Sequence, residues 1–127
     1  MKEYEKISEN CKILWKENFE LTTEKYTQVS GYIFNDGEVV YISDFREIPE
    51  ESLKLIKVKP EILIMPLTTP KGTRFHASLE DLLGYAERIE PKRMIINHMA
   101  VESDYAEVYS HCPRGIEPAY DGMEVCW

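Results

Sequence analysis

The sequence predicts an α/β domain, built on one mixed sheet with about three helices. Two short apolar runs, residues 62–65 and 94–97, are typical of buried strands, and each precedes a segment with helical spacing. A pair of β-rich runs, residues 29–34 and 38–43, surrounds a turn signal. Because strands that alternate with single helices are joined by right-handed crossovers, we expect part of the sheet to be parallel.

The size and charge of the chain limit its class. With 127 residues and 43% hydrophobic residues, it is expected to form one domain over residues 1–127, without a linker or an internal repeat. Its 23 acidic and 15 basic residues give a net charge of -8, which repels a phosphate backbone, so we expect no direct nucleic-acid binding.

Targeting and redox signals are few. The first residues contain no apolar h-region, and the longest apolar run, residues 62–65, ends at Pro66. We therefore expect a cytoplasmic protein that does not associate with membranes. The three cysteines form no CxxC pair, which favours reduced thiols over a disulfide framework.

The first strands form a predicted hairpin. Asn35, Asp36 and Gly37 separate the runs 29–34 and 38–43, and such residues favour a tight turn. The second run is almost entirely apolar, as expected of a strand covered on both faces, and it leads directly into Asp44. Asp44 is therefore expected at the carboxyl end of a strand.

A first helix is predicted to begin near Pro49, because proline is tolerated in the first turn and the carboxylates of Glu50 and Glu51 favour the positive end of the helix dipole. Leu53, Leu55 and Ile56 extend this predicted helix. After the strand 62–65, residues 66–77 form a loop that contains His76.

The second helix has the strongest signals. Ser78 and Asp81 resemble a capping box, apolar residues recur at helical spacing as far as Ile89, and Pro91 ends the pattern. The strand 94–97 then brings His98 to a carboxyl end. His98, like Asp44, is therefore expected directly after the carboxyl end of a strand.

A third helix is predicted to be capped by Ser103 or Asp104, with Cys112 on its apolar face, where burial is expected. Residues 116–127 are β-like, with a turn at residues 120–122. Residues 1–28 have no firm assignment: residues 12–19 alternate enough for an edge strand, and residues 1–10 are typical of a helical turn or a frayed end.

Asp44, His76 and His98 are all expected at the carboxyl rim of the sheet, where functional groups gather in open α/β sheets. A carboxylate and imidazoles suit zinc, manganese or iron, and a bound cation lowers the pKa of water. The spacing alone is a weak pattern. Structural roles remain open: Asp44 can cap a turn, His76 can pair with the helix start, and His98 can bond the backbone.

Several linked motifs resemble a known family. In order and spacing, about residues 29–125 resemble the second half of metallo-β-lactamase-superfamily hydrolases, most closely the branch of the carbon-phosphorus lyase pathway phosphodiesterase. The motifs are Gly31-Tyr32-Ile33-Phe34, Tyr41-Ile42-Ser43-Asp44, Ile48-Pro49-Glu50-Glu51-Ser52-Leu53, His76-Ala77-Ser78-Leu79-Glu80, Ala86-Glu87-Arg88-Ile89, Pro91-Lys92-Arg93, Asn97-His98-Met99 and Ala119-Tyr120-Asp121-Gly122.

The resemblance implies the C-terminal half of an αββα sandwich and a phosphodiester-type hydrolase that uses zinc or manganese. It implies that Asp44 is a metal ligand that bridges two ions and that His98 is the last metal-binding histidine. His76 matches a catalytic histidine that faces the substrate phosphate, as an electrophile or as a proton donor to the leaving group.

The chain departs from this pattern in its ligand count. The family's HxHxDH motif is absent, and the only histidines are His76, His98 and His111. Residues 21–27, where the family places its middle histidine, contain none, although Glu24 offers an oxygen. His111 is expected to be a solvated side chain at the carboxyl end of the last helix.

Three functions therefore remain open. In the first hypothesis, the chain is one subunit of a split hydrolase and is inactive alone, because a separate chain supplies the N-terminal half-domain. Alternatively, it is a non-catalytic module that self-associates as a homodimer to cover an exposed sheet face. In the third hypothesis, a homodimeric enzyme shares Asp44, His76 and His98 between its subunits.

Overall fold

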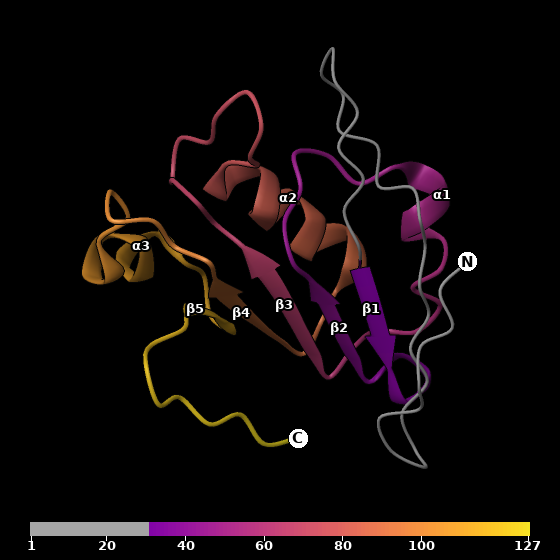
Figure 1. Ribbon diagram of the computed structural model, residues 1–127. Helices are drawn as coiled ribbons and strands as arrows, with labels where there is room; N and C mark the ends of the chain where they lie inside the picture. The colour runs from indigo at the N-terminus through magenta and orange to yellow at the C-terminus, as the bar shows by residue number, and fades with distance from the viewer. Residues whose placement is uncertain (1–30) are drawn as a thin grey trace.

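The computed structural model describes residues 31–127, which form a five-stranded mixed sheet with three α-helices, as predicted (Figure 1). The strands are ordered β1-β2-β3-β4-β5, as in the sequence; β1 and β2 are antiparallel and the later pairs are parallel. The strands are β1 (Gly31–Phe34), β2 (Val39–Ile42), β3 (Ile62–Pro66), β4 (Arg93–Asn97) and β5 (Ile116–Pro118). Predictions for residues 1–10, for residues 12–19 and for Glu24 lie outside the described residues.

The turn between β1 and β2 is a short 3-10 segment, η1 (Asn35–Gly37). All three of its residues have positive φ angles, which asparagine, aspartate and glycine tolerate better than most residues. The predicted hairpin and its turn are confirmed.

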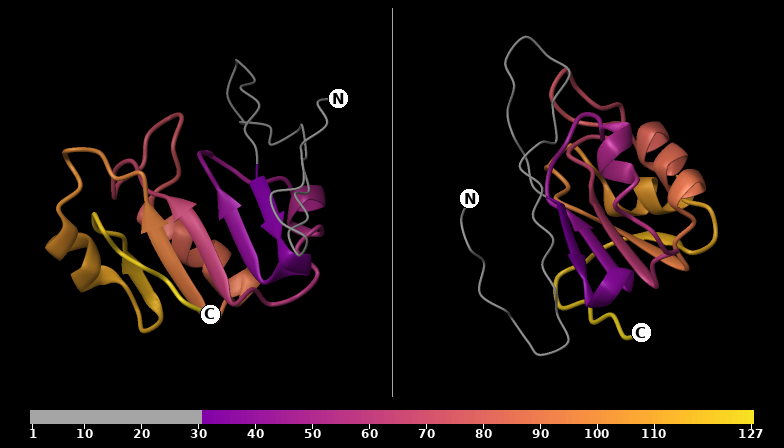
Figure 2. Two further views of the ribbon diagram at one scale, coloured as in Figure 1. Left: turned by 60° about the horizontal axis from the view of Figure 1, so that its bottom comes forward. Right: turned by 90° about the vertical axis from the view of Figure 1, so that its right-hand side faces the viewer.

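One helix follows each of β2, β3 and β4 in the sequence: α1 (Glu50–Leu53), α2 (Leu79–Ile89) and α3 (Tyr105–His111). All three helices cover the same face of the sheet (Figure 2, right). The main core lies between that face and the helices and contains sixteen buried residues, among them Val40, Leu63, Met65, Leu82 and Ile96.

The predicted capping box fixes the start of α2. The Ser78 hydroxyl accepts a hydrogen bond from the Asp81 amide at 3.1 Å, and the Asp81 carboxylate accepts one from the Ser78 amide at 2.9 Å. These bonds satisfy two amides that the helix itself cannot pair. After Ile89, Glu90 adopts a left-handed conformation with φ 55°, and Pro91 prevents continuation.

The prediction that α1 continues through Ile56 was wrong. The helix ends at Leu53, and the amides of Leu55 and Ile56 bond to carbonyls only three residues earlier, a tightening typical of helix ends. Pro60 follows closely and disfavours helical geometry in the residue before it. The apolar residues that suggested a longer helix instead pack against the core from a turn.

The C-terminal tail also forms less strand than its β-like sequence predicted. β5 ends at Pro118, which has no amide to donate to a ladder. Beyond it, the amide of Met123 bonds the carbonyl of Tyr120 at 2.9 Å, so the predicted turn is present. Cys112, as predicted, packs partly buried against the core, and its thiol donates to the carbonyl of Val108 at 3.2 Å.

The second face of the sheet has a smaller apolar cluster, to which none of the described helices contributes. We call it the open-face cluster; its buried members are Val39, Ile62 and Ile95, and Phe34, Ile64, Ala119, Met123 and Val125 pack against them. Residues 119–125 thus bring the tail to this face. Within residues 31–127, no helix combines the length and apolarity needed to span a bilayer.

Candidate functional site

The sheet register places Asp44 and His98 at the same level of the carboxyl rim. Tyr41, Ile64 and Ile95 lie side by side on β2, β3 and β4, and Asp44 and His98 each follow three residues later along the outer two of these strands. Since neighbouring strands are about 4.8 Å apart, the two backbones are separated by roughly 10 Å. Side chains at that spacing can converge on one ligand.

His76 is held directly against Asp44. Its Nδ1 lies 3.0 Å from the Asp44 Oδ1, and both side chains are only partly exposed, at 29% and 36%. The expectation that these two groups share the rim therefore agrees with the structure. The alternative pairing of the His76 side chain with the start of α2 is not the interaction found.

The loop before α2 fixes the position of His76. The Thr73 hydroxyl accepts hydrogen bonds from the amides of Phe75 and His76, both at 3.1 Å, and the Thr73 amide donates to the His76 carbonyl at 2.9 Å. The next amide, of Ala77, donates to the carbonyl of Phe45 at 3.0 Å. This hydrogen bond joins the backbone directly after His76 to the backbone directly after Asp44.

Gly72 makes this tight loop possible. Its φ is 70°, and a Cβ atom there would lie 2.8 Å from the Ser78 amide nitrogen and 3.0 Å from the His76 carbonyl oxygen. A side chain at this position would therefore meet backbone atoms that cannot move aside without disturbing the His76 loop or the cap of α2.

Two further contacts join the segment after Asp44 to α2. Arg46 pairs with the Asp81 carboxylate at 3.1 Å, the same group that caps the helix. The amide of Ile48 donates to the Tyr85 hydroxyl at 2.9 Å. Burial raises the pKa of Tyr85, an effect that the Ile48 hydrogen bond partly opposes, so this phenol stays neutral at ordinary pH.

His98 has a backbone conformation that is uncommon among residues other than glycine. Its φ is 57°, in the left-handed region, and its side chain is exposed. The loop is held by the Ala100 amide and the Ser103 hydroxyl, which both donate to the Thr68 carbonyl, at 3.0 Å and 2.9 Å. Strained conformations of this kind are frequent at functional sites.

A buried acceptor lies next to His98. The side-chain oxygen of Asn97 is buried and accepts no hydrogen bond from any residue that the structure describes. A buried acceptor without a donor is costly, so a group from outside residues 31–127 would be stabilised at this position.

The described residues do not complete a metal centre. Nowhere in residues 31–127 do three or more histidine, cysteine, aspartate or glutamate side chains gather closely enough to hold a metal ion. Asp44 and His98 have the donor atoms that zinc or manganese prefers, but a tight site needs more ligands than these. The donor chemistry fits a divalent cation, whereas the donor count is too small.

His111 takes the role predicted for it. Its side chain is exposed on α3, and Nδ1 lies 2.8 Å from the carbonyl oxygen of Glu107, within the last turn of the helix. It supplies no ligand to the rim.

Sequence reasoning missed the residues that support the site. Arg46 and Tyr85 act through contacts with residues more than thirty positions away, which no local pattern predicts. Thr73 was detectable in principle, because a hydroxyl that accepts from the amides two and three residues later is a known turn motif.

Comparison with known proteins identifies the fold. No family model and no curated protein matches the sequence. Among solved structures, a diphosphatase from the PhnP family superposes with a TM-score of 0.77 at 24% identity, covering 93% of this chain and 44% of that one. The short form of human tRNase Z superposes with a TM-score of 0.63 at 14% identity, covering 91% of this chain and 42% of the other.

A third match is the metallo-β-lactamase fold protein YhfI from Bacillus subtilis, with a TM-score of 0.63 at 11% identity and coverage of 87% of this chain and 47% of that chain. The chain therefore has part of the metallo-β-lactamase fold, as the sequence resemblance predicted. It spans less than half the length of each of these three proteins.

Proposed function

We propose that this chain contributes one part of a metal-dependent hydrolase of phosphodiester-type bonds, and that it is inactive alone. The main supporting observation is the carboxyl rim, where Asp44 and His98 follow β2 and β4 at one level, with β3 between these strands, and His76 contacts Asp44. One of the proteins that share the fold is a diphosphatase, which agrees with chemistry on a phosphorus centre.

The proposed roles follow from the donor atoms. Asp44 and His98 would hold the cation, zinc or manganese, which supplies charge neutralisation and a more acidic bound water. His76 in its protonated form donates Nδ1–H to Asp44 and presents Nε2–H to a phosphate oxygen or to the leaving group. The carboxylate thus orients the imidazole.

The missing ligands are proposed to come from a second polypeptide segment, on another chain or elsewhere on the same one. Two observations support this: the described residues lack a three-donor group, and one face of the sheet is not covered by the described helices. An apolar sheet face is stabilised by a covering layer, and a second half-domain would supply both that layer and the ligands.

The test combines metal analysis with solution mass and turnover of a nitrophenyl phosphodiester. The chain alone is expected to retain zinc or manganese weakly and to be inactive, and activity is expected when a half-domain that contains HxHxDH is added. In that complex His98→Ala should abolish metal binding, whereas His111→Ala, the same change on an exposed helix, should not. Stoichiometric metal and turnover by the chain alone would contradict the proposal.

A second candidate is a non-catalytic module that self-associates through the open-face cluster. The observation in its favour is that no three-donor group forms among residues 31–127. It predicts a symmetric, metal-free dimer whose mass is unchanged by Asp44→Ala and His98→Ala. Loss of a bound metal in these variants would contradict this candidate.

A further inference from the structure

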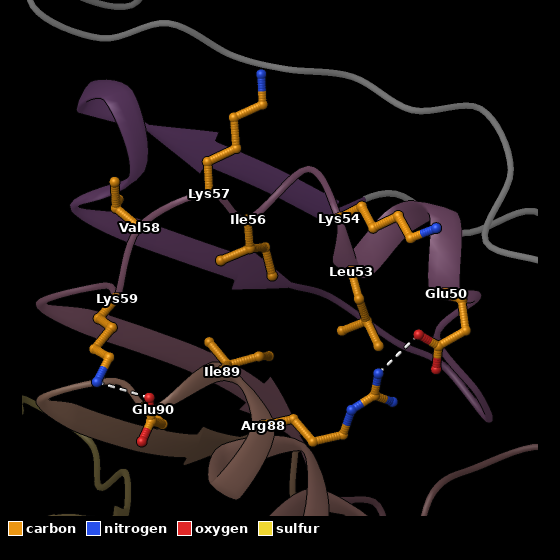
Figure 3. A pocket seen from close by; sticks show the side chains of 10 residues that line it. All are labelled: Glu50, Leu53, Lys54, Ile56, Lys57, Val58, Lys59, Arg88, Ile89 and Glu90. Carbon is orange, nitrogen blue, oxygen red and sulfur yellow. Dashed lines mark hydrogen bonds and ion pairs between the residues drawn. The ribbon is translucent and has the colours of Figure 1, made fainter.

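A groove lies between the last turn of α2 and the segment formed by α1 and the residues that follow it. It has a volume of about 310 Å³ (Figure 3). α2 begins next to His76 and its last turn contributes to the groove; eleven helical residues at about 1.5 Å each separate the two ends by roughly 16 Å. The groove is therefore separate from the candidate metal site.

The floor of the groove is apolar. Leu53, Ile56 and Ile89 form it, and Figure 3 shows their side chains between the two backbone segments. Val58 lies at one end with 51% of its surface exposed. Such a floor favours an apolar side chain from a ligand over water.

The groove is rimmed by positive charge. Lys54, Lys57, Lys59 and Arg88 line it, against only two carboxylates. Arg88 pairs with Glu50 at 2.8 Å and Lys59 with Glu90 at 2.7 Å (Figure 3). Lys54 and Lys57 form no ion pair within 4.0 Å with any residue that the structure describes, although the charge of Lys54 also acts on Glu50. Both ammonium groups can therefore pair with a ligand.

A second groove, of about 270 Å³, lies on the other side of α2 and extends the basic surface. It adds Arg114, Lys92, which pairs with Glu61 outside the groove, and one carboxylate, Glu87. Together the two grooves include six of the ten basic residues among residues 31–127, but only three of the seventeen acidic ones. The groove residues thus have a net charge of +3, and the remaining described residues have a net charge of -10.

We propose that this basic double groove binds an acidic polypeptide segment with apolar side chains. The lysines would pair with its carboxylates, and a leucine-like side chain would occupy the floor formed by Leu53, Ile56 and Ile89. A nucleic acid fits less well, because the rest of the surface is strongly negative and no aromatic residue lines either groove for base stacking.

The probe is a short fluorescein-labelled peptide of glutamates interspersed with leucines, titrated with the full chain at low salt. Lys54→Glu combined with Lys57→Glu is expected to weaken its binding roughly tenfold or more, with a smaller difference at high salt. Lys71→Glu is the matched control, since Lys71 is exposed and lies outside both grooves. This control should leave the affinity within about twofold.

The floor is tested separately. A peptide with serines in place of the leucines should bind at least about fivefold more weakly, because each lost apolar contact weakens binding. Circular dichroism melting verifies that the double variant folds, and Leu53→Ser provides a second variant that leaves all charges in place.

Several results would overturn the proposal. If the peptide binds the wild type and the folded double variant equally well, the groove is not its binding site. If the serine peptide binds as tightly as the leucine peptide, the binding is only unspecific charge attraction. Tighter binding of single-stranded DNA would instead identify a nucleic-acid surface. Self-association of the wild type at low salt, lost in the double variant, would identify a second copy as the occupant.

Discussion

The two faces of the sheet are closed by different means. On one face, the sheet, three helices and their loops enclose sixteen buried apolar residues. On the other, the open-face cluster has three buried members and includes residues of the tail after β5. Consecutive residues of a strand point to opposite faces of the sheet. Two adjacent residues therefore allow the two faces to be compared at nearly the same backbone position. The face with helices has its covering layer among the described residues, whereas for the other face we propose a further layer.

The carboxyl rim follows the same division. The segments that hold Asp44 and His76 are anchored to α2 through Arg46, Asp81 and Tyr85, on the helix side. His98 is exposed, and the buried Asn97 oxygen beside it has no donor among residues 31–127. The part of the rim with Asp44 and His76 is therefore held in place by contacts with α2. The additional metal ligands are proposed to lie near His98, which has no such contact with α2.

The largest expected effect separates two neighbouring isoleucines on β4. Ile96→Ala removes a side chain that is fully buried in the main core and should lower the free energy of unfolding by about 2–5 kcal/mol. Ile95→Ala, in the open-face cluster, should cost about 1–2 kcal/mol, because a thinner layer collapses more easily into the space left. Urea unfolding followed by circular dichroism measures both. Equal losses would show that the two faces are equally closed.

A second pair on β2 tests a polar group at constant shape. Val40→Thr places a hydroxyl in the main core and should cost about 1–3 kcal/mol, the penalty for a buried group without a partner. Val39→Thr places it in the open-face cluster, where a smaller loss, of about 1 kcal/mol, is expected because Val39 keeps 8% of its surface exposed, against 2% for Val40. Urea unfolding measures the loss of stability in both variants, and equal losses would contradict the expected difference between the two faces.

Val39→Thr also tests whether the open face binds a partner. If a second half-domain covers it, the hydroxyl loses its remaining contact with water in the complex, and the affinity should fall roughly tenfold, beyond the small loss of stability in the isolated chain. An unchanged affinity, measured by titration calorimetry, would exclude this face as the interface.

The helix layer depends on a local signal as well as on packing. Ser78→Ala removes one half of the capping box and should lower the stability by about 1 kcal/mol. Ser110→Ala, on the exposed side of α3, is the matched control, because its hydroxyl contacts only groups of its own helix turn, the Glu107 carbonyl and the His111 ring, and its loss should change little. A thermal melt that shows equal shifts would contradict the role of the cap.

Local patterns predicted most of the fold because they coincide with strong short-range chemistry. The capping box of Ser78, the Asn35–Gly37 turn and the apolar runs that end at Asp44 and His98 all act over a few residues. The length of α1 was misjudged, since Leu55 and Ile56 pack against the core from a turn and their spacing alone resembles a helix.

The site was less predictable for a different reason. The Asp44–His76 contact joins residues 32 positions apart, and the loop geometry that permits it depends on Gly72 and Thr73. Such contacts arise only after the elements pack together. The resemblance to metallo-β-lactamase-fold hydrolases supplied the expected rim. Within residues 31–127, however, no three histidine, cysteine, aspartate or glutamate side chains gather closely enough to hold a metal ion.

The smallest effect is a difference in thiol reactivity between two cysteines that belong to the two regions. Burial raises the pKa of Cys112, which packs against the helix-covered core, whereas Cys126 is exposed on the tail. Only the thiolate reacts, so near neutral pH Cys112 should be alkylated by iodoacetamide several-fold more slowly than Cys126, and its rate should rise only at higher pH. Peptide mass analysis assigns each rate, and the Cys112→Ser variant should lose only the slow phase at this position. Equal rates in the folded chain would mean that α3 does not shield its cysteine, and that the helix layer is less closed than the sixteen-residue core implies.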